Sequence, residues 1–300
     1  MARLTPLGPA LALALVPAAA ALAEPAAYQT PQAALEALIA ALESGSDEAV
    51  LAVFGPENAD IILTGNAAED DANRNAVLEQ YRAGYRFVPG PEEQLTLELG
   101  PDGWPFPIPL AQQAGEWAFD PVAGEAVMRS REIGLNELDV IALMDAYVDV
   151  QAEFRLRDHD GDGLMEFARS VIAEDGGRDG LYWQDGTGPL GAAIARAAAE
   201  GHGMDGTDHP PEPYLGYVFR ILNAQGPAAP GGAMSYLVNG AMLAGHALLA
   251  VPASYGETGV HSFMVAENGR ILEADLGEET TAAAAAITAY DPGPDWQPTD

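Results

Sequence analysis

The chain of 300 residues contains no cysteine and no lysine. Without cysteine, thiol catalysis, iron–sulfur clusters, cysteine-based zinc sites and disulfides are excluded. Without lysine, a P-loop lysine, a Schiff-base lysine and a serine–lysine dyad are excluded as well. The motifs HExxH and GxSxG are also missing, because the nearest string, PASYG at 252–256, lacks the first glycine. The sequence therefore offers few of the familiar reaction types.

Basic residues are scarce. The chain has 13 basic and 45 acidic residues, which gives a net charge of −32 at pH 7. Such a surface repels nucleic acid and anionic lipid, and it suits cations, basic partners or simple solubility. We therefore expect no nucleic-acid partner. The same composition is also typical of a habitat or genome bias, so the total charge alone indicates no function.

Long apolar runs are missing beyond the N-terminus, where Leu11–Leu22 follows the lone charge of Arg3. The run ends in the string ALA at 21–23, whose small residues predict a signal peptide cleaved between Ala23 and Glu24. The alternative is an anchor helix, but the run is short and rich in alanine for a membrane span. The pattern predicts a periplasmic or secreted protein without a transmembrane segment after cleavage. Removing Arg3 leaves 12 basic residues against 45 acidic ones, a net charge of −33.

The periodicity of the mature chain predicts an α+β fold with two lobes. In the N-terminal lobe, residues 24–130, helices are followed by an antiparallel meander with strands near 95–99, 108–111 and 117–119. Thr30 as N-cap and Pro31 at the first helical position open the first helix. The signal peptide occupies residues 1–23.

The C-terminal lobe, residues 131–291, is predicted to pack a long helix on a twisted antiparallel sheet. The helix is expected from Leu135 to Phe154, and strands are expected at 217–222 and 247–251, followed by a hairpin. Asn268-Gly269 favours a tight two-residue turn in this hairpin. Short helices are expected at 190–199 and 282–286, and residues 292–300 are expected to form a loose tail.

The run DHDGDG at 158–163 is the closest approach to a chemical site. Asp158, Asp160 and Asp162 occupy positions one, three and five of a calcium loop, where oxygens point inward. Glu166 stands at position nine, and position twelve is Arg169 instead of glutamate. The pattern predicts a reduced calcium turn that uses these three aspartates and Glu166.

The alternative for the same run is an exposed acidic turn that caps a following helix, with Arg155 and Arg157 as neutralising neighbours. Half-motifs of this kind are common in acidic loops. Both interpretations stay open at the level of sequence.

The histidines show no helical metal spacing. His202 and His209 lie in a Gly/Pro-rich loop that favours solvent over a transition metal. His246 and His261 lie in or beside predicted strands near Ser254, where a hydroxyl–imidazole–carboxylate arrangement with Asp275 or Glu257 is conceivable. A strand histidine is more often a packed or hydrogen-bonded one, so no catalytic residue is assigned.

Several strings occur together in order: WPFPIP at 104–109, DGDG at 160–163 with EFA at 166–168, DGLYW at 179–183, GYVFRIL at 216–222, APGGA at 229–233, and VPASYG at 251–256 with GV at 259–260. The set resembles the bacterial exported family catalogued as domain of unknown function 2950. The resemblance implies an exported, periplasmic protein of Gram-negative bacteria, with no activity or catalytic residues to carry over. The second half is similar, more weakly, to the globular domain of pilin-like proteins, although the prepilin leader is missing.

Together these features predict an exported acidic protein that acts as a non-catalytic binding or envelope-associated module, stabilised by calcium. Its partner would be a protein or small-molecule ligand of the cell envelope. Two alternatives stay open. One is a periplasmic hydrolase that uses His246, His261 and Ser254, and the other is a pilin-like subunit of a secretion or pilus apparatus.

Overall fold

The structure, a computed structural model, describes residues 24–91, 94–173, 177–183, 185–190 and 212–299. The predicted signal peptide, the loop with His202 and His209, and nearly all of the helix expected at 190–199 lie outside the described residues. The chain divides into two compact units, Met1–Val127 and Met128–Asp300. Helices and antiparallel sheets occur in both, so the predicted α+β class is confirmed.

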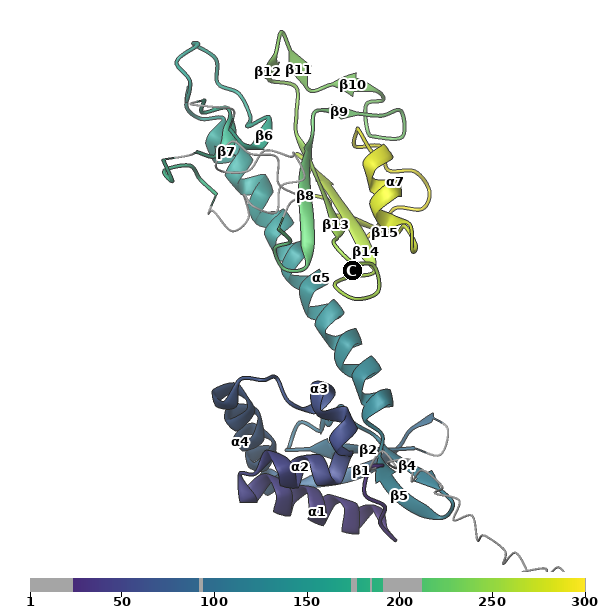
Figure 1. Ribbon diagram of the computed structural model, residues 1–300. Coiled ribbons are helices and arrows are strands. Elements are labelled where there is room, and N and C mark those ends of the chain that lie inside the picture. Colours follow the sequence, from purple (N-terminus) through teal and green to yellow (C-terminus); the bar gives the residue numbers. More distant parts are fainter. Residues whose placement is uncertain (1–23, 92–93, 174–176, 184, 191–211, 300) are drawn as a thin grey trace, which may run out of the picture. The chain divides into compact units, whose positions relative to one another are not determined.

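In the first unit the helices precede a small sheet in the sequence (Figure 1). Its helices are α1 (Pro31–Ser44), α2 (Asp47–Phe54), a 3-10 turn (Pro56–Asn58), α3 (Ala59–Ile62) and α4 (Ala67–Ala83). Its strands are β1 (Tyr85–Pro89), β2 (Leu95–Leu99), β3 (Trp104–Pro105), β4 (Leu110–Gln113) and β5 (Glu116–Phe119). They pair antiparallel in the order β1-β2-β4-β5, with β3 on β2.

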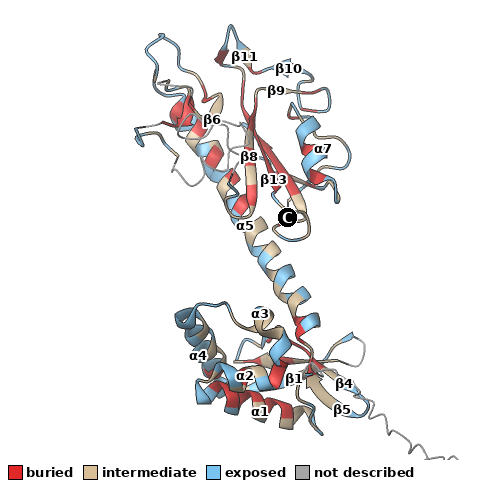
Figure 2. Ribbon diagram, viewed as in Figure 1, coloured by how far each residue is buried: buried red, intermediate tan, exposed pale blue. Residues whose placement is uncertain are grey.

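Local sequence sets the ends of α1. Thr30 accepts a hydrogen bond from the N–H of Ala33 at 3.1 Å, and Gly45 ends the helix in the left-handed conformation. The buried side of α1 carries Leu35 and Leu38, which join Leu97 of β2 in the core of this unit (Figure 2). The first core is thus formed between an amphipathic helix and one face of the meander.

Helix α5 (Pro121–Phe154) begins 14 residues before the start that periodicity predicts. Asp120 accepts the N–H of Ala123 at 3.0 Å, and Pro121 takes the first helical position. The helix continues through Gly124, where a Cβ would lie 2.8 Å from the side chain of Ile108. The boundary between the two units falls within α5.

The second unit contains most of the strands. They are β6 (Ser170–Ile172), β7 (Gly180–Tyr182), β8 (Tyr217–Leu222), β9 (Ala224–Gln225), β10 (Met234–Ser235), β11 (Leu237–Val238), β12 (Ala241–Met242), β13 (Ala247–Pro252), β14 (His261–Ala266), β15 (Leu272–Asp275) and β16 (Gln297–Pro298), with the short helix α7 (Thr280–Ala286) before the last. The main sheet has the antiparallel order β16-β15-β14-β13-β8. The tail is expected to be loose, yet β16 pairs with β15.

Strand β13 is buried along its whole length because helices cover both faces of the main sheet. On one face Tyr147 of α5 donates a hydrogen bond to the carbonyl of Ala247 at 3.3 Å. On the other face Arg220 of β8 donates to the carbonyls of Ala284 and Ile287 at the end of α7. Figure 1 shows α5 and α7 on opposite sides of these strands.

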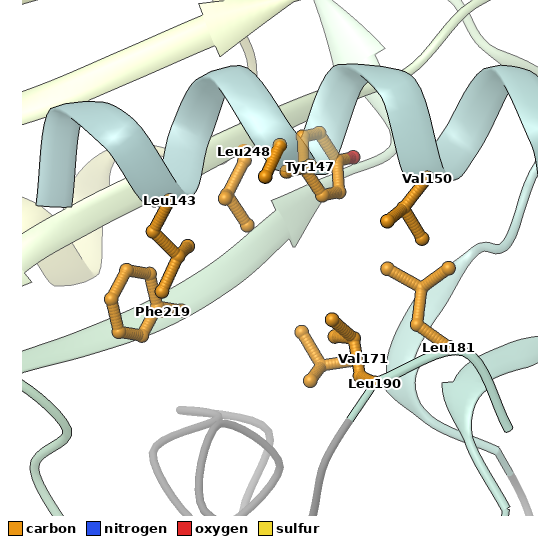
Figure 3. A pocket seen from close by; sticks show the side chains of 9 residues that line it. Leu143, Tyr147, Val150, Val171, Leu181, Leu190, Phe219 and Leu248 are labelled. Atoms are coloured by element: carbon orange, nitrogen blue, oxygen red, sulfur yellow. The ribbon is translucent and has the colours of Figure 1, made fainter.

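A small cavity of about 60 Å³ lies between α5 and the main sheet (Figure 3). Leu143, Tyr147 and Val150 line it from α5, and Phe219 and Leu248 line it from the sheet. Because its walls are apolar, it is expected to stay dry and to act as a packing defect rather than a ligand site.

The hairpin of β14 and β15 is present, but its turn is wider than the Asn-Gly pair predicts. The paired residues of β14 and β15 that lie nearest the turn are Met264 and Leu272. Of Asn268 and Gly269, only Gly269 has a positive φ. The tight Asn-Gly turn occurs instead between β11 and β12, where Asn239 and Gly240 have φ values of +55° and +95°.

Among the described residues, every helix is too short or too polar to span a bilayer.

Candidate functional site

The aspartate loop directly follows α5. Carboxylate oxygens of Asp158, Asp160 and Asp162 lie within 4.8 Å of one another, and all three residues are exposed. Asp158 accepts the N–H groups of Gly161 at 2.7 Å and Gly163 at 3.0 Å. These backbone hydrogen bonds hold the pKa of Asp158 below its usual range, and the bond from Gly161 has the largest effect. Three converging carboxylates are a donor set that fits a hard cation.

The same carboxylates also fold their own loop. The N–H of Asp162 donates to Asp160 at 3.2 Å, and that of Leu164 donates to Asp162 at 2.7 Å. Aspartates form such turns with their own backbone without any ion. The geometry is therefore compatible with a calcium turn and with the exposed acidic turn.

Glu166 stands apart from the three aspartates. Its Oε2 accepts the N–H of Met242 at 2.9 Å, and the carbonyl of Met242 accepts the N–H of Phe167 at 2.9 Å. Burial is the main cause that raises the pKa of the Glu166 carboxyl. Glu166 thus fastens β12 to the segment after the loop. Its predicted role as an ion ligand stays a prediction.

His261 pairs with a carboxylate that the sequence analysis did not consider. Its Nδ1 lies 3.2 Å from Oε2 of Glu137 on α5. Oε1 of the same carboxylate accepts the N–H groups of Val260 and His261, both at 2.9 Å. The hydroxyl of Tyr217 donates to the carbonyl of His261 at 2.8 Å. The carboxylate of Glu137 thus orients the imidazole of His261. It also ties the start of β14 to α5, mainly through the two backbone N–H groups.

The hydroxyls near His261 bond elsewhere. Ser254 donates to Oε2 of Glu257 at 2.6 Å, and Tyr255 donates to Asp275 at 3.3 Å. His246 lies at the opposite end of the strands, since Ala247 pairs with the last residue of β14 whereas His261 is the first. Within the described residues, no hydrogen bond therefore joins Ser254 or His246 to the imidazole of His261, as the hydrolase hypothesis would need.

His246 is buried among aromatic rings. It is 1% exposed, and its ring centroid lies 5.2 Å from that of Tyr147 and 4.7 Å from that of Phe167. Neither ring nitrogen has a hydrogen-bond partner in the described part of the chain. Burial, and then the charge of Arg155, lowers the pKa of His246 to about 4. The imidazole is therefore neutral at physiological pH.

Gln151 is a further buried polar residue that the sequence analysis missed. It is fully buried, and its side-chain amide forms two hydrogen bonds with the backbone of Ala168, both at 2.9 Å. The available signal was its place on the apolar side of α5, three residues before Phe154. Glu137 lies on the same side of the helix, but acidic residues are so frequent along α5 that its position did not single it out.

Glu137→Ala is expected to lower the free energy of unfolding by about 2 kcal/mol, because two backbone N–H groups lose a charged acceptor. Urea unfolding at neutral pH measures the change. Asp139→Ala is the matched control: the residue is exposed on the same helix, and its replacement should change stability by less than about 0.5 kcal/mol. Equal effects of the two substitutions would contradict the assigned role of Glu137.

A family model described as "Protein of unknown function (DUF2950)" matches residues 25–299. The matched span includes both compact units and all the candidate residues described above. Neither the curated proteins nor the solved structures contain a match. The weaker likeness of the second half to pilin-like proteins is not confirmed.

Proposed function

The chain belongs to the DUF2950 family, and from its own geometry we propose that it is an exported, non-catalytic binding module of the cell envelope. One observation carries the proposal. The polar side chains that could do chemistry are engaged separately: Ser254 donates to Glu257, His246 lies at the opposite end of the strands from His261, and the carboxylate beside His261 holds backbone N–H groups. The apolar run near the N-terminus supports export.

A panel of ester, glycan and peptide substrates tests the absence of catalysis. We expect no turnover above buffer by the full mature chain. Among the described residues, the Glu137–His261 pair is the feature that favours the rival hydrolase, because a carboxylate that orients an imidazole is part of many catalytic sites. Turnover that disappears in both Glu137→Gln and His261→Ala would establish the rival and refute the proposal.

We also propose that the aspartate loop binds calcium and thereby stabilises the second unit. The support is the convergence of Asp158, Asp160 and Asp162 and the hard-oxygen chemistry of their carboxylates. The ion would neutralise three like charges held close together. Because the loop directly follows α5, its ordering would strengthen the end of the helix that packs on the main sheet.

Calcium at ten times its dissociation constant is expected to raise the melting temperature by about 3–6 °C, since such binding adds about 1.4 kcal/mol. The comparison is between the full chain in calcium and in chelator. Asp160→Asn with Asp162→Asn keeps the oxygens that fold the loop but removes two charges, so the shift should vanish. Asp185→Asn is the matched control, because Asp185 folds a separate exposed turn with Thr187. Identical melting temperatures in calcium and in chelator would refute the calcium proposal.

A further inference from the structure

A larger cavity, of about 320 Å³, lies at the end of the main sheet where β13 begins and β14 ends. This volume is at the lower end of the range for small-molecule sites, so it suits a short or single-ring ligand. Its walls come from segments far apart in sequence. The polar and aromatic residues that line it are Gln225, Tyr236, His246, Glu267, Asn268 and Tyr290.

The charges around this cavity favour a cation. Glu267 is the one charged residue among its lining residues, all of which are described. Arg155 contacts Oε1 of Glu267 at 3.5 Å from outside the lining. Oε2 lies 3.6 Å from where a Cβ on Gly245 would be, on the wall of the cavity. Among the described residues Oε2 has no ion-pair partner, so one carboxylate oxygen of this lining residue remains for a ligand, and the net charge of −32 attracts cations to the protein as a whole.

Glycine at 245 keeps this part of the cavity open. Its φ of +139° disfavours other residues, and a Cβ would meet the ring of Tyr236 at 3.0 Å. The hydroxyl of Tyr236 donates to Gln225 at 3.1 Å, and burial raises the pKa of Tyr236 to about 12, so the ring stays uncharged. Uncharged tyrosine rings, here those of Tyr236 and Tyr290, attract cations through their faces.

His246 forms an uncharged part of the wall. It lines the cavity, is 1% exposed, and both of its ring nitrogens are buried. Its neutral imidazole does not repel a positive charge. An ammonium group would pair with the free oxygen of Glu267, whereas an anion would find no positive partner in the lining.

We propose that the cavity beside His246 binds a small organic cation, a primary amine with a short aliphatic body. The inference rests on the proposed binding role and names the ligand class of that role. It is independent of the calcium loop, since none of the three aspartates lines this cavity.

Titration calorimetry of the full mature chain at fixed ionic strength tests the proposal with three probes of similar length. The probes are 1,4-diaminobutane, 1,4-butanediol and succinate. We expect the diamine to bind, the diol to bind at least about tenfold more weakly, and succinate not to bind. Glu267→Gln should weaken diamine binding about tenfold or more. Glu273→Gln, which removes a carboxylate from β15 outside the cavity, is the matched control and should bind as the unmodified chain does.

Each of the remaining outcomes would contradict one part of the proposal. Equal binding of diol and diamine overturns the cation assignment, and no binding of the diamine at millimolar concentration overturns the site. Equal weakening by Glu273→Gln would reduce the binding to general attraction by the acidic surface. Glu267→Gln is expected to fold normally, because the Glu267 side chain is 53% exposed. Chemical turnover of any probe would refute the proposed non-catalytic role without removing the site.

Discussion

Gln151→Ala is expected to destabilise the second unit by about 4 kcal/mol. The Gln151 side chain donates to the carbonyl of Ala168 and accepts its N–H, both at 2.9 Å, and also donates to the hydroxyl of Tyr147 at 3.1 Å. Both Gln151 and Ala168 are fully buried. Truncation leaves two buried backbone groups without partners, at about 1–3 kcal/mol each, and it opens a cavity beside them.

Gln151→Met separates the two causes, because it keeps the length of the side chain but removes both backbone hydrogen bonds. We expect it to lose about 2–3 kcal/mol, intermediate between the unmodified chain and Gln151→Ala. Urea unfolding at neutral pH, followed by far-ultraviolet circular dichroism, measures all three proteins. A Gln151→Met protein as stable as the unmodified chain would show that the pairing with Ala168 contributes nothing.

The second large effect is a loss of stability in acid that depends on His246. The pKa of this residue is lowered from its ordinary value of 6.5 to about 4 in the folded protein, chiefly by burial. The unfolded chain therefore binds the proton more readily than the folded one. Stability from this residue is complete above about pH 6.5 and falls as the pH drops to about 4, with little further change below. Since one pKa unit corresponds to about 1.4 kcal/mol, the total loss is about 3 kcal/mol.

The measurement is the free energy of unfolding in urea between pH 8 and pH 4.5. Burial raises the pKa of Glu166, so its protonation acts with the opposite sign near the lower end of this range. Comparison with His246→Leu removes that contribution, because both proteins retain Glu166, Arg155 and Glu267. At pH 5 the free energy of unfolding of the variant should equal or exceed that of the unmodified chain. The decrease in this free energy below pH 6.5 should be absent from the variant. An identical pH profile in the two proteins would mean that the imidazole protonates freely in the folded state.

Much of the fold could be predicted because its signals are local. Thr30 and Pro31 open α1 as predicted, and Gly45 ends it. The early start of α5 was missed although Asp120 and Pro121 carry the usual start signal, because Gly124 and Gly134 lie in the first turns and interrupt the apolar pattern. Glycine at 124 allows α5 to approach Ile108 closely. This is a tertiary contact, which a local sequence pattern does not reveal.

The two Asn-Gly pairs illustrate the same limit. Only Asn239-Gly240 forms the tight turn, whereas Asn268-Gly269 lies in a wider loop in which the N–H of Gly269 donates to the carbonyl of Ala266. The dipeptide is compatible with both turns, and the register of the flanking strands decides between them. Strand β16 was missed for a related reason, since two residues pair only because β15 presents a free edge.

The candidate site was predictable where the partners are close in sequence and not where they are distant. The three aspartates converge because alternate positions of one tight loop must do so. Glu137 meets His261 across more than a hundred residues of chain, and Glu166 meets the backbone of Met242 across 76. Such partners are set by how α5 and β12 lie against the rest of the unit, which composition and periodicity do not determine.

The central claim is that the polar side chains around α5 hold backbone segments in place. Hydrogen exchange at the N–H groups of Ala168, Val260 and His261 tests it most directly, because each is bonded to a side chain of α5. We predict that all three are protected in the unmodified chain. Ala168 should lose protection in Gln151→Ala, and Val260 and His261 should lose it in Glu137→Ala. Rapid exchange of these N–H groups in the unmodified chain, or unchanged protection in the variants, would contradict the account.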